Sequence, residues 1–249
     1  MIGTAAFPSG ARLIRAFRRR RPGDFLKLCL LNLRVVLSGE AKRHAYVHDD
    51  SWDRLYGVST AGTLETDEFG APPEELVGAV RYEPTPPDCF EWLVEAAELE
   101  PGVDYTFIDV GSGKGRVLLL AALHGFKRVI GIELGVELHD AACRNIARMR
   151  GRLGSAKVTS IRADATRFDF PPEPTLCFLN NPFDAAVLDR LLDRIEASRA
   201  ATPRPFTLIY YHSNHADRIA ARPGWEMVRS GFWTDESHHF TIHRAGAAG

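Results

Sequence analysis

The sequence has few cysteines and no excess of charge of either sign. The four cysteines, Cys29, Cys89, Cys143 and Cys177, are far apart and form no C-x-x-C pair, so neither a zinc knot nor an iron–sulfur cluster is expected. Reduced, mostly buried thiols predict a cytoplasmic protein. Lys and Arg total 31 against 32 Asp and Glu, which gives no strong signal for nucleic-acid binding through long-range phosphate attraction.

Long apolar runs are also lacking. No stretch reaches the ~20 apolar residues that span a bilayer, so no transmembrane segment is predicted. Four arginines at positions 18–21 precede the apolar stretch Phe25–Leu37, a layout that resembles a signal peptide. Polar residues interrupt that stretch and no small-residue cleavage site follows it. We therefore predict an amphipathic helix over residues 25–48 that packs on the main domain or over its active site, with peripheral membrane contact as a second interpretation.

Two parts of the chain differ in composition. Residues 1–87 are expected to form an N-terminal helical extension and a lid segment, and residues 88–249 the main domain. From Ser51 to Pro87 the sequence is rich in glycine, threonine, proline and acidic residues, which indicates a long irregular stretch. Such a stretch is either a lid over a binding site or a plain covering loop. Its marked residues are Trp52, Tyr56, Gly57, Thr60 and Gly62.

From Cys89 onward, short apolar stretches alternate with amphipathic ones. The predicted strands are 105–110, 128–133, 157–162, 175–179, 206–211, 225–233 and 238–243. The predicted helices between them are 90–99, 117–123, 138–149, 185–197 and 216–221. This alternation predicts an α/β three-layer sandwich with a mostly parallel sheet covered on both faces. The last two strands are joined by a short turn, so they are expected to form an antiparallel hairpin at the sheet edge.

A glycine-rich loop follows the first predicted strand and precedes a helix. Its residues are Asp109, Gly111, Ser112, Gly113 and Gly115. A dinucleotide fingerprint would need a third glycine where Arg116 stands, and a phosphate-binding loop would need Ser or Thr directly after Lys114. The D-x-G-x-G-x-G spacing instead fits a loop that binds S-adenosylmethionine. The alternative is a glycine turn with a structural role only.

Acidic residues end the next two predicted strands. Glu133 lies about twenty positions past the glycine loop, where a carboxylate can accept both hydroxyls of a ribose. The alternative is a solvated residue at the strand end. Asp164 is placed to bond the amino group of an adenine, with Ala165 packing against the ring. A helix-cap or turn role for Asp164 is an equal alternative.

With these residues the sequence resembles the class I S-adenosylmethionine-dependent methyltransferases, over about residues 80–245. The resemblance implies a seven-stranded, Rossmann-like sheet with a reversed last strand. It also implies that S-adenosylmethionine lies across the carboxyl ends of the strands, leaves as S-adenosylhomocysteine, and acts without a metal. Within the superfamily the chain resembles small bacterial proteins that carry Tyr-x-Pro-Thr-Pro, here Tyr82–Pro86. It is loosely similar to seven-stranded protein-lysine methyltransferases.

The end of the fourth predicted strand bears on the reaction type. Many amine methyltransferases of this superfamily carry Asn or Asp, then Pro-Pro, then an aromatic residue at this point. There an amide oxygen and a backbone carbonyl hold the target nitrogen, and the ring packs on the substrate. The corresponding residues here are Asn180, Asn181, Pro182 and Phe183. Because Asn181 stands where the first proline is expected, either asparagine can be the functional one. A proline-terminated strand with a packing Phe183 is the structural alternative.

An attacking amine must first lose a proton, since a free lysine has a pKa near ~10.4. Tyr82, Tyr211 and His212 are the candidates that could assist, and Thr85 could contact the methionine end of the cofactor. The three late histidines, His238, His239 and His243, are interpreted as ordinary strand residues. On a strand, His239 and His243 share a face while His238 points away.

The sequence thus predicts a methyltransferase that uses S-adenosylmethionine to methylate an amine of a protein side chain or of a small molecule. Three alternatives stay open: a small-molecule O-methyltransferase, a binding module that no longer transfers methyl groups, and a dehydrogenase. Neither the methyl acceptor nor the oligomeric state is encoded in a pattern of residue types.

Overall fold

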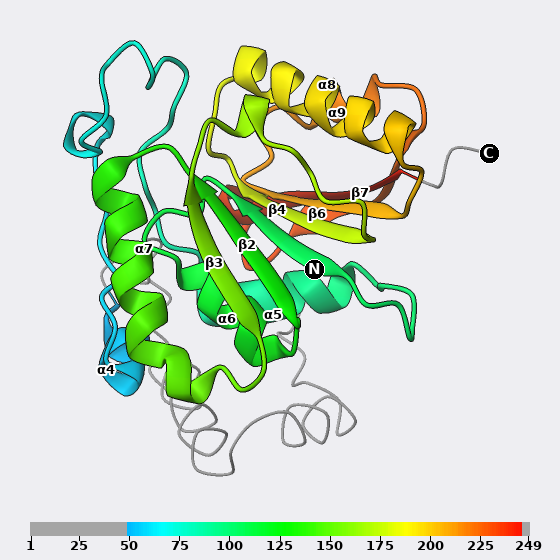
Figure 1. The fold of residues 1–249 in the computed structure, drawn as a ribbon. Helices are drawn as coiled ribbons and strands as arrows, with labels where there is room; N and C mark the ends of the chain where they lie inside the picture. Colours follow the sequence, from blue (N-terminus) through cyan, green and yellow to red (C-terminus); the bar gives the residue numbers. More distant parts are fainter. Residues whose placement is uncertain (1–48, 246–249) are drawn as a thin grey trace.

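The computed structural model describes residues 49–245, in which one central sheet is flanked by helices (Figure 1). The predicted helix at 25–48 and its membrane contact lie outside the described residues. Within residues 49–245, no helix has the length and apolarity that crossing a membrane requires.

The sheet has seven strands in the order β3-β2-β1-β4-β5-β7-β6. They are β1 (Thr106–Val110), β2 (Arg128–Glu133), β3 (Lys157–Arg162), β4 (Thr175–Asn180), β5 (Phe206–Tyr211), β6 (Trp225–Phe232) and β7 (His239–Ala245). The first five strands pair in parallel, while β7 is antiparallel to both β5 and β6. The expected edge hairpin and reversed last strand are thereby confirmed.

The helices are α4 (Ser51–Tyr56), α5 (Pro87–Ala96), α6 (Arg116–His124), α7 (Val136–Met149), α8 (Ala185–Ala201) and α9 (Ala216–Ala220). Helices α8 and α9 cover one face of the sheet, and α5 and α6 lie on the other (Figure 1). Successive strand residues point to opposite faces, so each strand supplies two separate apolar layers. Phe107 packs with α5 and α6, whereas Ile108 packs with α8. This is the predicted three-layer α/β sandwich.

The stretch from Ser51 to Pro87 is less irregular than the sequence suggested. Residues 51–56 form α4, and a 3-10 turn spans Thr66–Glu68. Trp52 and Tyr56, four residues apart on one side of α4, are buried in the same core cluster as Phe107. Gly57 ends the helix with φ 71°, a left-handed cap that glycine adopts without strain. Six residues are too few for a periodic pattern, so the prediction of an entirely irregular stretch was wrong here.

The late histidines also differ in part from expectation. His238 ends a 3-10 turn before β7 begins at His239, so it is not the strand residue that was expected to face opposite to His239, and it is buried beside the Tyr211 hydroxyl. His243 is fully buried on β7, and burial lowers its pKa to about 4.

The position of the site follows from the strand order. Strands β1 and β4 are neighbours, but the chain runs outward from β1 through β2 to β3 and then returns to β4. The connections on the two sides of this point leave in opposite directions, which opens a crevice at the carboxyl ends of β1 and β4. The glycine loop and residues 180–183 meet at this crevice.

Candidate functional site

The glycine loop turns sharply between β1 and α6. Gly111, Gly113 and Gly115 have φ of 73°, 53° and 82°, in the left-handed region that favours glycine. The amides of Gly111 and Ser112 donate to the carbonyl of Ile132 on β2 at 2.9 and 3.1 Å. A methyl group on Gly113 would lie 2.2 Å from the Tyr82 ring, and one on Gly111 would lie 2.5 Å from Pro182. Close approach therefore requires glycine at two of these positions.

Two buried carboxylates lie beside this loop. Glu133 accepts hydrogen bonds from the amides of Gly113 and Gly135, at 2.7 and 2.8 Å. Burial raises the pKa of Glu133, although these backbone donors act in the opposite direction. Asp109 is the last residue but one of β1, and burial, followed by the nearby charge of Glu133, raises the pKa of its carboxyl well above the ordinary value. A ligand that donates hydrogen bonds or carries positive charge would stabilise both carboxylates.

Asp164 takes the capping role that was one of its two alternatives. It accepts hydrogen bonds from the Thr166 amide at 2.9 Å and from the Thr166 hydroxyl at 2.7 Å, which caps the 3-10 turn Ala165–Arg167. Asp164 and the buried Ala165 nevertheless both face the cavity described next. The cap fixes the position of the carboxylate at the cavity wall and does not exclude a ligand contact.

A cavity of about 120 Å³ lies at the crevice. It brings together predicted residues from five places in the chain: Tyr82, Gly111, Gly113, Glu133, Asp164, Ala165, Asn180, Pro182 and Phe183. Asp109, Ser112, Thr85, Gly115, Asn181 and His212 are close to it in the fold but do not line it. Residues 64–83, which we call the cover, form its outer wall and add Phe69, Glu75 and Val80.

The two asparagines after β4 face different partners. The side chain of Asn180 lines the cavity, whereas the Asn181 amide oxygen accepts a hydrogen bond from the buried Tyr210 hydroxyl at 2.9 Å. Asn180 donates to the carbonyl of Glu83 at 3.1 Å and to the Thr85 hydroxyl at 3.2 Å. Of the two, only Asn180 is placed to contact a ligand in the cavity.

His212 lies behind Asn180 at the end of β5. Its Nδ1 is 2.9 Å from the Asn180 amide oxygen. Because the Asn180 amide nitrogen donates elsewhere, its oxygen must accept, so His212 carries its proton on Nδ1. His212 and Asn181 have φ of 50° and 41°, in a region that residues other than glycine adopt at a cost. Backbone strain of this kind collects at functional sites.

Tyr82 is one of the residues predicted to assist the loss of the amine proton. Its ring lies against Gly113, and its hydroxyl donates to the carbonyl of Thr60 at 2.6 Å. Burial raises the pKa of Tyr82 well above its ordinary value, so the phenol stays protonated at neutral pH. Tyr82 therefore forms part of the cavity wall and donates a hydrogen bond here, and its assistance in the loss of the amine proton stays a prediction. Tyr211 is fully buried in the core, with its hydroxyl against His238, and does not line the cavity.

Sequence reasoning missed Phe69 and the buried partners of Arg116. Phe69 is buried against Gly135, two residues after Glu133, but no periodicity marks it within an irregular stretch. Arg116 was considered only as a missing glycine, although its place directly after the loop was a signal that could have been followed. Among residues 49–245, no group of three His, Cys, Asp or Glu side chains could hold a metal ion.

The chain is similar to a curated protein and to several solved structures. No protein-family model matches the chain. The chain is 32% identical over 167 residues to ribosomal RNA small subunit methyltransferase A of Streptomyces griseus, an alignment that covers 63% of this chain and 52% of the relative. The chain thus spans about half the length of that relative.

Solved structures with a similar arrangement include TrmN from Thermus thermophilus and the ribosomal protein L11 methylase of Lactobacillus delbrueckii. The TM-scores are 0.48 and 0.44, with 20% and 14% identity, covering 66% and 64% of this chain and 49% and 78% of theirs. The sheet order and the glycine loop agree with the seven-stranded, Rossmann-like fold that the sequence resemblance implied.

Proposed function

We propose that this protein transfers a methyl group from S-adenosylmethionine to an amine nitrogen. The observation that carries the proposal is the cavity at the crevice between β1 and β4. It unites the glycine loop, Glu133, the Asp164–Ala165 pair and the Asn180–Phe183 turn in one site. Each part has one function in such a reaction, and the fold brings all of them to the same edge of the sheet.

The residues present fit this cofactor. Glycine at 111 and 113 lets the backbone approach a ligand closely, and Glu133 has acceptor capacity left for ribose hydroxyls. The raised pKa of Asp109 indicates a buried carboxylate that lacks a cationic partner, and the cofactor's ammonium group would supply one. The buried Ser112 hydroxyl also has no hydrogen-bond partner within residues 49–245.

The size of the cavity adds one requirement. Pockets for ligands of this size measure about 300–1,000 Å³. The cavity is smaller, about 120 Å³, and Phe69 and Val80 of the cover form part of its outer wall. Binding therefore requires part of the cover to move outward.

When bound, S-adenosylmethionine supplies an electrophilic methyl group that the amine lone pair attacks in line as the carbon–sulfur bond breaks. Asn180 would hold the amine, because its amide oxygen has a second lone pair beside the one that accepts from His212. His212 is then a positioning residue that fixes the orientation of the Asn180 amide. Phe183 provides an apolar wall beside the acceptor.

Charge around the cavity favours a cationic acceptor. Residues 65–83 contain one basic side chain, Arg81, and six carboxylates. The carboxylates are Glu65, Asp67, Glu68, Glu74, Glu75 and Glu83. Glu75 and Glu83 line the cavity itself, next to the exposed Val77 and Val80. Such a mouth attracts a lysine side chain or a polyamine and repels a polyanion.

RNA is a second candidate acceptor, favoured by the name of the Streptomyces relative. The surface near the cavity offers little uncompensated positive charge for it. An adjacent open hollow carries Arg167, Arg190 and Arg194 together with Asp164 and Asp193. Arg167 and Arg194 are paired with Asp164 and Asp169. The acidic cover therefore favours an amine on a protein or small molecule over RNA.

The test has a binding step and a transfer step. Calorimetric titration with S-adenosylmethionine and S-adenosylhomocysteine should show binding that Glu133→Gln weakens strongly. Transfer of a radioactive methyl group should then be compared among a lysine-rich peptide, spermidine and a small-subunit ribosomal RNA transcript. Labelling of the peptide or spermidine, lost in Asn180→Ala, is the expected result. Labelling of the transcript alone would establish the second candidate. Binding without transfer to any acceptor, or transfer to a hydroxyl, would contradict the proposal.

A further inference from the structure

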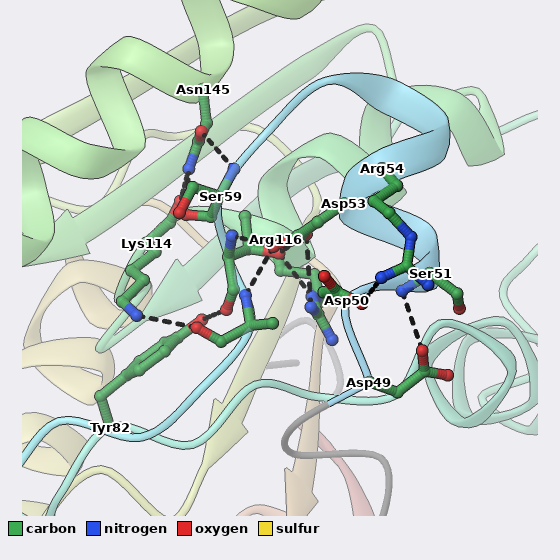
Figure 2. Close-up of polar contacts among 12 residues, drawn as sticks. Asp49, Asp50, Ser51, Asp53, Arg54, Ser59, Tyr82, Lys114, Arg116 and Asn145 are labelled. Atoms are coloured by element: carbon green, nitrogen blue, oxygen red, sulfur yellow. Dashed lines mark hydrogen bonds and ion pairs between the residues drawn. The ribbon is translucent and has the colours of Figure 1, made fainter.

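A buried ion pair sits directly behind the glycine loop. Arg116, the first residue of α6, donates from Nε to the Thr60 hydroxyl at 2.6 Å and lies 3.4 Å from the Asp53 carboxylate (Figure 2). The side chains of Arg116 and Asp53 are only 3% and 7% exposed. The Arg116 guanidinium also lies 5.6 Å from the centre of the Trp52 ring.

This ion pair is poorly explained by stability alone. A cation at the first residue of a helix opposes the helix dipole, and removing two charges from water costs free energy that their attraction seldom exceeds by much. Because the ion pair is unfavourable in both respects, we interpret it as a contact that fixes the position of a neighbouring segment and not as a source of stability. What the pair positions is the short turn of residues 59–61, which we call the clamped turn.

Every backbone polar group of the clamped turn is bonded to a side chain. Asn145 pairs with both the amide and the carbonyl of Ser59, each at 3.0 Å. Asp53 accepts from the amides of Thr60 and Ala61. The carbonyl of Thr60 accepts from Tyr82, and that of Ala61 accepts from the Lys114 ammonium at 2.9 Å. Figure 2 shows these side chains converging on the turn from α4, α7 and the glycine loop.

The clamped turn fixes two parts of the cavity wall, the Tyr82 ring and the glycine loop. Through its carbonyls it holds the hydroxyl of Tyr82, whose ring closes on Gly113, and the ammonium of Lys114, which is part of the glycine loop. Asn145 also donates to the carbonyl of Lys114 at 2.9 Å. The loop is thus held from its outer side by the same residues that hold the turn.

We infer that Asp53, Thr60 and Arg116 are positioning residues for cofactor binding, an inference that rests on the proposed function. They hold the clamped turn, and through Tyr82 and Lys114 they keep the glycine loop in the shape that receives S-adenosylmethionine. None of the three lines the cavity, so each acts through other residues. Loosening the clamp should weaken cofactor binding while leaving the chemical step of a saturated enzyme almost unchanged.

The test variant is Thr60→Val, which keeps the shape of the side chain and removes the hydroxyl that bridges Arg116 and Asp53. Thr60→Ser restores that hydroxyl. Thr106→Val is the matched control, since Thr106 is equally buried but lies at the far end of β1. We expect Thr60→Val to bind S-adenosylhomocysteine about tenfold more weakly or worse, equivalent to ~1.4 kcal/mol. Thr60→Ser and Thr106→Val should bind like the wild type.

Kinetics and a second variant complete the test. In Thr60→Val the KM for S-adenosylmethionine should rise while kcat at saturating cofactor changes less than about twofold. If Thr60→Val does not fold, Tyr82→Phe decides, because it removes only the hydroxyl that holds the carbonyl of Thr60 and keeps the ring on Gly113. Unchanged affinity in the folded variant would overturn the inference and leave the proposed function standing. A wild-type protein that binds neither ligand would overturn both.

Discussion

Two neighbouring segments at the carboxyl edge of the sheet differ in how many hydrogen bonds tie their backbone to the rest of the domain. In the clamped turn, all six backbone amides and carbonyls are bonded to side chains of α4, α7, the glycine loop or Tyr82. The cover, residues 64–83, is closed at its base by paired hydrogen bonds between Leu64 and Tyr82. Beyond that base it shares few backbone hydrogen bonds with the rest of the described domain: Glu137 donates to the carbonyl of Phe69, Asp184 to that of Gly78, and Val80 to that of Pro182.

This difference shows how one edge of a sheet can hold a binding loop in a fixed shape and still let a ligand enter. The clamped turn stands behind the glycine loop and does not line the cavity, whereas the cover forms the outer wall of the cavity. Segments with few buried contacts open at low free energy, and buried bonded ones open only with the whole domain. We therefore assign a fixed wall to residues 59–61 together with Tyr82, whose hydroxyl they hold, and a movable wall to residues 69–80.

The largest loss of stability is expected from breaking the buried ion pair between Arg116 and Asp53, which holds the fixed wall. Arg116→Met leaves the buried Asp53 carboxylate without its cation, which should lower the free energy of unfolding by about 3–5 kcal/mol. Urea denaturation measures this change. Lys127→Met is the control, because Lys127 pairs with Asp104 on the surface and an exposed pair contributes about 0–1 kcal/mol. Equal losses in the two variants would contradict a special role for the buried pair.

A smaller loss of stability is expected at Gly113, where the Tyr82 ring packs on the glycine loop. Gly113→Ala would place a methyl group 2.2 Å from the Tyr82 ring, and such overpacking costs about 1–3 kcal/mol besides the strain at positive φ. Gly62→Ala is a matched control, since Gly62 has φ of 78° but no atom within 4 Å of the added methyl. It should show the backbone strain alone, about 1 kcal/mol. Thermal and urea unfolding of both variants separate close approach from strain.

Substitution in the cover should affect binding more than stability. Phe69 is buried, yet Phe69→Ala should lower the free energy of unfolding by only about 1 kcal/mol, because the cover opens without unfolding the domain. Phe107→Ala in the core should cost about 3–5 kcal/mol. Calorimetry with S-adenosylhomocysteine should still show weaker binding by Phe69→Ala. Equal destabilisation by the two substitutions would mean that the cover is part of the rigid domain.

The smallest effect is a pH dependence from Glu133. Its pKa is raised by burial, so the folded state holds the proton more tightly than the unfolded state does. The stability that this group contributes is fully present below its ordinary value of 4.5 and is lost as the pH rises through the raised value. Glu133→Gln cannot ionise, so its stability relative to the wild type should rise with pH above 4.5. A difference that stays constant between pH 4 and 8 in urea unfolding would contradict the raised pKa.

The strands and long helices could be predicted from the sequence because short apolar runs alternate with amphipathic stretches, and both are local features of the chain. The glycine loop and Glu133 could be located for the same reason, since a strand end and a loop spacing are local features. The roles of Asn180 and Asn181 could not be separated, because only the fold shows that Tyr210 holds one and the cavity takes the other. The clamp was beyond sequence reasoning, since Arg116 and its partner Asp53 are 63 positions apart.

The most direct test is hydrogen exchange of the backbone amides, measured with and without S-adenosylhomocysteine. We predict that the amides of Thr60 and Ala61 exchange slowly in both states. We also predict fast exchange at residues 69–80 that slows when the ligand binds. Equal exchange in the two segments, or no change at residues 69–80 at saturating ligand, would contradict a cofactor site with one fixed and one movable wall.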